Sequence, residues 1–414
     1  MSHIKPDNAA QLEEAVQWAL AQEETLEVLG AGSKKSLGRK ITCDHQLDLS
    51  GLTGITLYEP EELVLSARAG TPLSEIEAAL AEHNQYMAFE PLDYGPLFSG
   101  QPNSDNTNSG TIGGAIACNL SGPRRIKSGA ARDHFLGFSA VSGRGETFKS
   151  GGRVVKNVTG YDLMKLMAGS FGTLGVMSDI TIKVLPAPNE EKTYLLHGLD
   201  DDRAMEAMKQ ALNSSCEISS AAHIPQALAA TLELLPSDQA TTALRLEGHG
   251  PSVSYRVAKL EALLKDFGNG QLIDLSDSRA LWRELRDGAP LAGNSDHSVW
   301  RISVPPKSGS AYIDSLNLGS DTRYFYDWGG GLIWLSFPGG DNATLLRNAL
   351  EGITGHATLL TSPEGASDQD VPNHPLGTGE HMLMRRVKEN FDPKAILNPG
   401  RLYGDLPGRM FGDI

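Results

Sequence analysis

Hydrophobic residues recur at helical spacing after Asp7, where Leu12, Val16 and Leu20 share one face. Because aspartate favours the N-cap, the pattern predicts a helix that starts after Asp7 and reaches about residue 22. A second pattern of this kind predicts a helix from Leu73. Short apolar runs predict strands over 26–29, 47–50, 54–58, 63–67 and 180–185, and a hairpin over 135–141 and 145–150. This alternation favours an α+β or α/β domain.

The pattern changes at 187–191, so a domain boundary is predicted there. Beyond it, helices are predicted over 201–213, 252–265, 278–287 and 342–351, and strands over 242–247, 271–274, 298–304, 323–326, 332–337 and 356–360. Several strands follow one another without a helix between them, which favours an antiparallel sheet with helices on one face. A basic amphipathic helix over 382–390 and an extended segment to Leu402 follow. The expected units are therefore 1–187, 188–375 and 376–414.

Glycine is concentrated in the centre of the first unit. Sixteen of the 45 glycines lie between Gly95 and Gly175. A flexible linker would also be rich in glycine, but it would lack core residues such as Ile112, Ile116 and Ile180. Since glycine lets the backbone come close to another group, this stretch predicts the wall of a large ligand site built from main chain.

Composition excludes several classes of protein. Hydrophobic residues make up 40% and charged residues 21% of the chain, as in ordinary globular proteins, and the net charge is −15. This charge argues against nucleic acid and anionic membrane surfaces as partners. The N-terminal stretch has no apolar region of the kind found in signal peptides, so no signal peptide is expected. No apolar run of about 20 residues occurs, so no transmembrane helix is expected. Three widely spaced cysteines predict free thiols and a cytoplasmic protein: Cys43, Cys118 and Cys216.

A Gly-Ala-Gly-Ser-Lys-Lys loop follows the predicted strand 26–29. A dinucleotide-binding Rossmann turn would place a third glycine at position 35 and then continue as a helix. Lys35 occupies that position, and residues 39–44 have no amphipathic helical pattern. Two interpretations remain: a loop that cradles phosphate through backbone amides, Ser33 and the lysines, or an ordinary tight turn.

Four segments in this order resemble the FAD-linked oxidases of the vanillyl-alcohol-oxidase, or PCMH-type, family. They are Gly30–Ser33; Gly110–Gly114 with Asn119 and Gly122; Lys156–Leu163 with Gly169–Val176; and Asp392-Pro393 with Asn398–Arg401. The resemblance implies an α+β protein with a two-lobed PCMH-type FAD-binding domain, a cap domain carrying an antiparallel sheet with helices on one face, and a C-terminal segment that returns to the first domain.

The resemblance also implies which residues contact FAD. They are Gly30, Ala31, Gly32, Ser33, Lys34, Lys35, Gly110, Thr111, Gly113, Gly114, Asn119, Gly122, Gly172, Thr173, Gly175, Val176 and Asn398. In some members a histidine in or after the first loop binds the flavin covalently. Residues 30–43 contain no histidine, and His45 is the nearest, so non-covalent FAD is expected.

Within that family, three segments resemble the E-type subunits of bacterial glycolate oxidases: Phe89–Pro91, Val299–Pro305 and Asp327–Leu332. This resemblance implies a homologous D-type FAD subunit and an F-type iron–sulfur subunit as partners, and a small 2-hydroxy acid as substrate. It leaves open a peripheral association with the inner face of the cytoplasmic membrane through these partners.

Oxidation of a 2-hydroxy acid requires a cation for the carboxylate and a base for the hydroxyl proton. Arg301 is the candidate carboxylate anchor, because arginine binds carboxylates bidentately. Tyr324 and Tyr326 alternate onto one face of the next strand and are the other catalytic candidates. A salt-bridged arginine and core tyrosines are the alternative interpretation.

No metal site is expected. Related D-lactate dehydrogenases carry Gly-Glu-His-Gly, but here Met382 follows Gly379-Glu380-His381. Since His374 and His381 are separated by Pro375 and two glycines, they share no helical face.

Three functions remain open. The first is an FAD-dependent dehydrogenase or oxidase subunit that oxidises glycolate or a related 2-hydroxy acid and passes electrons to an iron–sulfur subunit. The second is a non-catalytic flavin-binding subunit for assembly and electron transfer, whose D-type partner performs the oxidation. A UDP-sugar enolpyruvyl reductase with the same FAD domain is a third.

Overall fold

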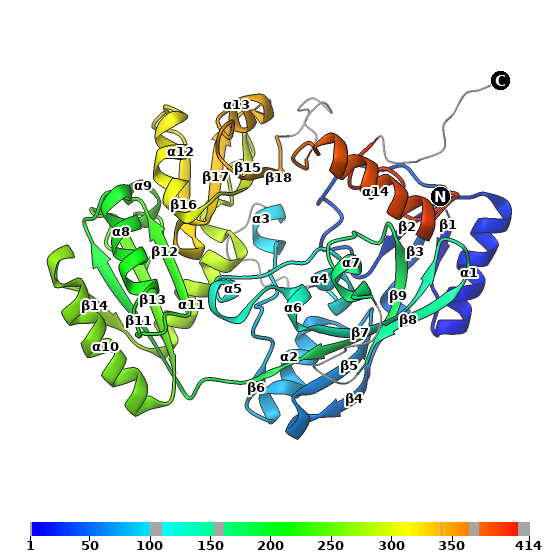
Figure 1. Cartoon of the computed structure of the whole chain (residues 1–414), viewed down its shortest axis with the longest axis horizontal. Helices are drawn as coiled ribbons and strands as arrows, with labels where there is room; N and C mark the ends of the chain where they lie inside the picture. The colour runs from blue at the N-terminus through cyan, green and yellow to red at the C-terminus, as the bar shows by residue number, and fades with distance from the viewer. Residues whose placement is uncertain (1, 100–109, 153–160, 341, 364–371, 405–414) are drawn as a thin grey trace.

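The computed structural model describes residues 2–99, 110–152, 161–340, 342–363 and 372–404. Figure 1 shows two lobes side by side, joined by a single extended stretch below and by packed segments above it. The first lobe contains the N-terminal part of the chain, and the second begins at Glu190. The last helix, α14 (Thr378–Phe391), returns to the first lobe.

The first lobe contains two larger sheets and a short antiparallel pair, β6 with β10. A parallel sheet has the order β1-β3-β2, and an antiparallel sheet has the order β4-β5-β9-β7-β8. The strands are β1 (Ser2–Ile4), β2 (Leu26–Leu29), β3 (His45–Asp48), β4 (Ile55–Glu59), β5 (Val64–Arg68), β6 (Gln85–Tyr86), β7 (Phe135–Ser142), β8 (Thr147–Gly151), β9 (Gly175–Lys183) and β10 (Leu185–Pro186). The helices are α1 (Ala9–Gln22), α2 (Leu73–Glu82), α3 (Gly95–Ser99), α4 (Ile112–Ala117), α5 (Arg125–Ser128), α6 (Ala131–His134) and α7 (Leu163–Met167). The predicted hairpin is confirmed as β7 and β8.

One local prediction needs correction. The N-cap of α1 is Asn8, not Asp7, because the Asn8 side chain accepts a hydrogen bond from the Gln11 amide. The two residues are neighbours, and a sequence pattern places the end of a helix only within a few positions.

Each of the two larger sheets of the first lobe has its own core. Leu65, Ile180 and Phe138 from the antiparallel sheet pack against α2 and α4. Leu26 and Leu47 from the parallel sheet pack against α1, and the C-terminal residues Ile396 and Leu397 complete this second core. The C-terminal segment is therefore part of the first lobe's interior.

The second lobe is an eight-stranded antiparallel sheet with the order β14-β11-β13-β12-β16-β17-β15-β18. Its strands are β11 (Glu190–His197), β12 (Ser220–Ile224), β13 (Thr241–Gly248), β14 (Gln271–Ile273), β15 (His297–Ser303), β16 (Arg323–Asp327), β17 (Leu332–Pro338) and β18 (His356–Thr361). Its helices are α8 (Asp201–Leu212), α9 (Gln226–Ala229), α10 (Gly250–Leu264), α11 (Leu275–Asp287), α12 (Gly309–Ser315) and α13 (Ala343–Asn348). The sequence predicts six of these strands and does not predict β11 and β12.

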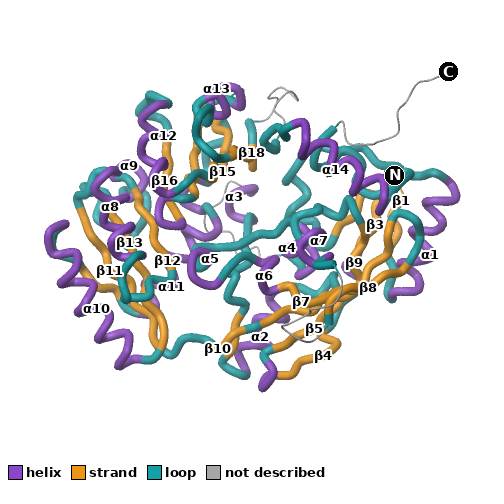
Figure 2. Tube along the Cα trace, in the orientation of Figure 1, coloured by secondary structure: helices purple, strands orange, loops and turns teal. Residues whose placement is uncertain are grey.

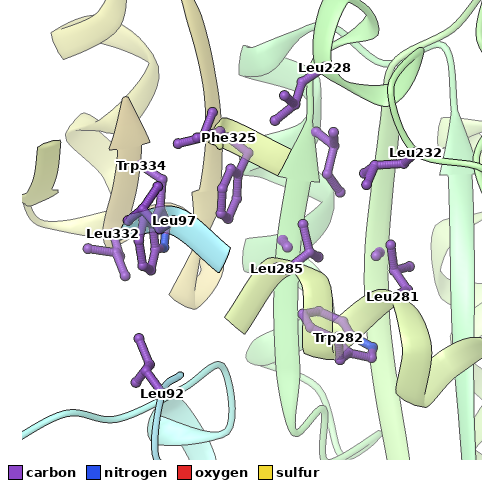
Figure 3. Close-up of a cluster of buried hydrophobic side chains, with 14 of the residues drawn as sticks. Leu92, Leu97, Leu228, Leu232, Leu281, Trp282, Leu285, Phe325, Leu332 and Trp334 are labelled. Carbon is purple, nitrogen blue, oxygen red and sulfur yellow. The ribbon is translucent and has the colours of Figure 1, made fainter. Parts of the chain in front are cut away.

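The two faces of this sheet pack against different partners. Helices α8, α10, α12 and α13 cover the outer face, and Figure 2 shows α10 and α11 on opposite sides of β11 and β13. The inner face packs against α9, α11 and leucines of the first lobe, including Leu92 and Leu97. Figure 3 shows this cluster, with Trp334 and Phe325 from the sheet pointing toward Leu97. An apolar core thus joins the lobes, because one face of the sheet is buried against the first lobe.

Within the described residues, no helix has both the length and the apolar character needed to cross a bilayer.

Candidate functional site

A cavity of about 100 Å³, open to solvent, lies in the first lobe between segments from four parts of the chain. Thirteen residues predicted from the resemblance line it: Gly30, Ala31, Gly32, Ser33, Lys34, Lys35, Thr111, Gly113, Gly114, Gly172, Gly175, Val176 and Asn398. The structure therefore brings together main chain from segments that are far apart in the sequence.

The loop after β2 is a series of turns. The Lys35 amide donates to the Gly32 carbonyl at 3.0 Å, and Gly32 adopts a positive φ of 75°. No helix follows the loop before β3, which agrees with the failed Rossmann pattern. The Arg401 guanidinium donates to the carbonyls of Lys34 and Lys35, so the C-terminal segment fixes the shape of the loop.

Glycines in and beside the cavity have two different structural roles. A Cβ atom on Gly30 would lie 2.5 Å from Oγ1 of Thr111, and one on Gly110 would collide with Ser33 and Lys34. These two glycines let the wall segments pack against each other. A Cβ atom on Gly32 would have no other atom within 4 Å. This side of Gly32 therefore faces free space in which a ligand could approach the backbone.

Lys34 is a buried cation in the wall of the cavity. Its side chain is 9% exposed, and its ammonium group lies 3.2 Å from Oγ of Ser33. Burial lowers the pKa of Lys34, while Cys118, Asp93 and Asp287 oppose the shift. An anion in the cavity would stabilise the charged form of this amine.

Asn398 joins two walls. Its side-chain amide donates to the Phe171 carbonyl at 2.7 Å, and its side-chain oxygen accepts from the Val28 amide at 2.8 Å. Asn398 has a φ of 41°, a region that asparagine adopts more readily than most residues. The side chain thus contributes to the cavity partly by holding its walls together.

Four predicted cofactor residues do not line the cavity. Gly110 abuts Ser33. The Asn119 side chain accepts from the Arg132 amide, and the Gly122 carbonyl accepts from the Trp328 indole. Thr173 donates through its hydroxyl to the Ser170 carbonyl at 2.7 Å. Residues 156–160 of the third resembling segment lie outside the described residues.

Sequence reasoning did not assign nine of the lining residues: Val28, Leu29, Leu49, Ala69, Ala117, Cys118, Phe171, Met177 and Arg401. Arg401 follows Asn398-Pro399-Gly400 in the resembling C-terminal segment, and this was the signal that could have identified it. Val28 and Phe171 carry no chemical signal, because only their positions beside the cavity distinguish them.

Arg301, the predicted carboxylate anchor, lies on the inner face of the second lobe's sheet. It pairs across strands with Trp334, whose ring centre is 5.0 Å from the Arg301 guanidinium carbon. Nη1 of Arg301 donates to the Tyr94 hydroxyl at 3.2 Å. Tyr94, Trp328, Phe171 and Cys118 belong to one apolar cluster, and Phe171 and Cys118 also line the cavity. Arg301 is therefore linked to the cavity through this cluster.

Tyr324 and Tyr326, the other catalytic candidates, are not brought together with Arg301. Their hydroxyls donate to Oδ2 of Asp201 at 2.9 and 2.6 Å, respectively. Both rings belong to the core on the outer face of the sheet, while Phe325 between them points inward. Because alternate residues of a strand point to opposite faces, the tyrosines cannot share the inner face with Arg301.

The two histidines considered for a metal lie apart from the cavity lining. His381 is in the first turn of α14, and His374 precedes that helix. Among the described residues, no group of three His, Cys, Asp or Glu side chains converges in a way that could hold a metal ion.

Comparison with known proteins gives matches over the whole chain. Residues 3–151 match the model of the FAD binding domain, and residues 375–402 match that of the C-terminal domain of FAD linked oxidases. Glycolate oxidase subunit GlcE of Escherichia coli (strain K12) is 34% identical over 97% of this chain and 99% of its own length. Glycolate oxidase subunit GlcD of Bacillus subtilis (strain 168) is 25% identical over 73% of this chain and 70% of its own length.

The fold also matches a solved structure. The crystal structure of p-cresol methylhydroxylase with substrate bound aligns with a TM-score of 0.66 at 14% identity, over 97% of this chain and 88% of that one. At this identity the likeness shows the fold alone, and it confirms the predicted PCMH-type architecture.

Proposed function

This chain belongs to the family of FAD-linked oxidases that includes glycolate oxidase subunit GlcE, and from that membership we propose that it is the FAD-binding subunit of a complex oxidising glycolate or a related 2-hydroxy acid. FAD is the cofactor, and the chain is an oxidoreductase of this family. The observation that carries the proposal is the convergence of separate main-chain segments on one cavity, with Lys34 buried in its wall.

The residues of the cavity fit an FAD diphosphate. Ser33, the amides around Gly32 and the Lys34 ammonium supply donors and positive charge, and an anion in the cavity would stabilise the charged form of Lys34, whose pKa burial lowers. No histidine lies in the loop, so FAD is expected to bind without a covalent bond. The chemistry that bound FAD supplies is the acceptance of two electrons from the carbon that carries the substrate hydroxyl.

The protein side chains have the task of holding the substrate. Arg301 binds the substrate carboxylate, and the Tyr94 hydroxyl orients the guanidinium group from the first lobe. Trp328 and Trp334 provide aromatic surfaces that confine this guanidinium. The product is the corresponding 2-oxo acid.

The proposed partners are a homologous D-type FAD subunit and an F-type iron–sulfur subunit that accepts the electrons. Support comes from the relatives GlcE and GlcD, both of which are named as subunits of glycolate oxidase.

A second candidate function is a flavin-binding subunit that assembles the complex and transfers electrons, while the D-type partner oxidises the substrate. The position of Tyr324 and Tyr326 favours it, because their bonds to Asp201 on the outer face remove both from the list of possible bases near Arg301.

Anaerobic titration with glycolate separates the two functions. The purified chain, alone and with its partners, is loaded with FAD, and flavin reduction is followed by absorbance. If this subunit oxidises the substrate, its flavin bleaches, and an Arg301→Gln variant with full FAD content bleaches far more slowly. If the flavin of a complex carrying Arg301→Gln is reduced at the wild-type rate, oxidation takes place on the partner.

A further inference from the structure

Two arginines lie against one indole ring at the junction of the lobes. The guanidinium carbon of Arg125 is 4.2 Å from the centre of the Trp328 ring, and that of Arg301 is 5.4 Å from the same ring. Arg125 begins α5 on the side of the first lobe that faces the second lobe (Figure 1), whereas Arg301 belongs to β15. One cation thus comes from each lobe.

Trp328 is held in an unusual backbone conformation. Its φ of 53° lies in the left-handed region, which a bulky residue rarely adopts. The Asp327 side chain accepts from the Trp328 amide at 2.7 Å, and the indole donates to the Gly122 carbonyl of the first lobe at 3.1 Å. Strain of this kind persists where the surroundings fix it, and it concentrates at functional sites.

Neither arginine has an acidic partner. Among the described residues, no carboxylate lies within 4.0 Å of the guanidinium nitrogens of Arg125 or Arg301, and Nε of Arg301 is buried without a hydrogen-bond partner. Arg124, the neighbour of Arg125, differs, because it forms ion pairs with Glu90, Glu191 and Glu247. Two half-buried cations thus lie beside one ring with no carboxylate in direct contact, and a bound anion would stabilise both of them.

The pKa of Arg125 agrees with this description. Burial lowers it, the nearby positive charges of Arg301 and then Arg132 lower it further, and Asp133 opposes the shift. A bound carboxylate would reduce the repulsion between these guanidinium groups. The pKa of His356 is likewise held below its ordinary value, by loss of solvation and then by His374 and the two guanidinium groups. His356 therefore adds little positive charge of its own at neutral pH.

We propose that Arg125 and Arg301 together form a carboxylate-binding subsite that is complete only when the two lobes are docked. Trp328 sets the spacing of the two guanidinium groups and excludes water from them. The ligand class is a small carboxylate with an adjacent oxygen atom, as in a 2-hydroxy acid or its 2-oxo product. The assignment of this ligand rests on the proposed function, and Arg125 is the residue that it adds to the site.

Binding of oxalate to the FAD-loaded protein tests the subsite without turnover. Oxalate is a planar probe with adjacent carboxylates, and its Kd is measured by calorimetry and by the change in tryptophan fluorescence. Arg125→Gln and Arg301→Gln should each raise the Kd by about tenfold or more, the usual effect of losing a charge-assisted contact. Arg125→Lys should retain part of the affinity, since it keeps the charge and loses the bidentate geometry.

Arg203→Gln is the matched control. Arg203 lies over the Phe267 ring at 5.6 Å in the second lobe and is exposed, so its replacement should leave the Kd unchanged. FAD content and the unfolding temperature of each variant show that it has folded. Wild-type oxalate affinity in folded Arg125→Gln would overturn the proposal.

Failure of the subsite and failure of the proposed function give different results. If oxalate binding depends on Arg125 but no 2-hydroxy acid reduces the flavin, the subsite stands and oxidation by this subunit is wrong. If glycolate reduces the flavin and the Kd of oxalate does not change when either arginine is replaced, the function stands and the subsite is wrong.

Discussion

Asp327 shows how one buried carboxyl group can set the pH response of the junction between the lobes. It is 2% exposed, and its side chain accepts from the Trp328 amide. Burial raises the pKa of Asp327 to about 7; the hydrogen bond from Trp328 opposes this shift, Glu90 adds to it, and Arg301 and Arg245 oppose it. The folded protein therefore keeps a proton that the unfolded chain has already released above about pH 4.

The resulting prediction concerns the pH dependence of stability. Since the folded pKa is raised, the free energy of unfolding should fall as pH rises from about 5 to 7, by up to about 1.4 kcal/mol per pH unit. Asp327→Asn keeps an acceptor for the Trp328 amide and should remove this slope. Urea unfolding across that pH range measures it, with the exposed Asp202→Asn as control. Equal slopes for wild type and Asp327→Asn would contradict the assignment.

At the scale of elements, local sequence patterns predicted the positions of most strands. They did not predict how the strands pair or which face of the sheet each residue occupies. The strand over 323–326 was predicted from its residues, and β16 has nearly these bounds. The face that each residue uses depends on the pairing of β16 with β12 and β17, which the local pattern does not contain. The sequence therefore predicts correctly that Tyr324 and Tyr326 share one face of the strand. It does not show that this face is the outer face of the sheet.

The strand β12 was missed for a related reason. Its sequence, Ser-Ala-Ala-His-Ile, has few strand-favouring residues. The strand forms because it pairs with β13 on one side and β16 on the other. In the candidate site, the lining glycines were predicted from a resemblance. Sequence could not show that Gly30 and Gly110 make room for the opposite wall, because that depends on which segments meet in space.

The C-terminal segment provides the element-scale prediction. Asn398→Ala removes the bonds to the Val28 amide and the Phe171 carbonyl and places a less suitable residue at a φ of 41°. Unpaired buried groups cost about 1–3 kcal/mol each, so the free energy of unfolding should fall by about 2 kcal/mol and FAD affinity should fall with it. Thermal unfolding and FAD titration measure both. Asn390→Ala, on the exposed side of α14, is the control. Unchanged FAD affinity would show that the cavity walls do not need this link.

At the scale of the whole molecule, buried charges join the lobes beside their apolar interface. Glu90 and Arg124 come from the first lobe, and Arg245 and Glu247 come from the second. Arg124 lies 2.5 Å from both carboxylates, and Arg245 lies 3.0 Å from Glu90. Burial opposes ionisation of Glu247, but Arg245 and Arg124 lower its pKa to about 2. The Glu90 pKa is also held below its usual value by Arg245 and Arg124, against the effect of burial.

Removing one charge of this network should weaken the docking of the two lobes without loss of FAD from the cavity. Glu90→Gln leaves Arg124 and Arg245 short of one counterion, and breaking a buried pair typically costs about 3–5 kcal/mol. The cavity is built from the first lobe and the C-terminal segment, so FAD content should remain near that of the wild type. The arginines around Trp328 come from different lobes, so oxalate affinity should fall together with compactness measured by small-angle X-ray scattering. The exposed pair of Arg385 and Glu389 is the control, because Arg385→Gln should change neither. Loss of FAD from Glu90→Gln at unchanged compactness would mean that the network supports the cavity rather than the docking of the lobes.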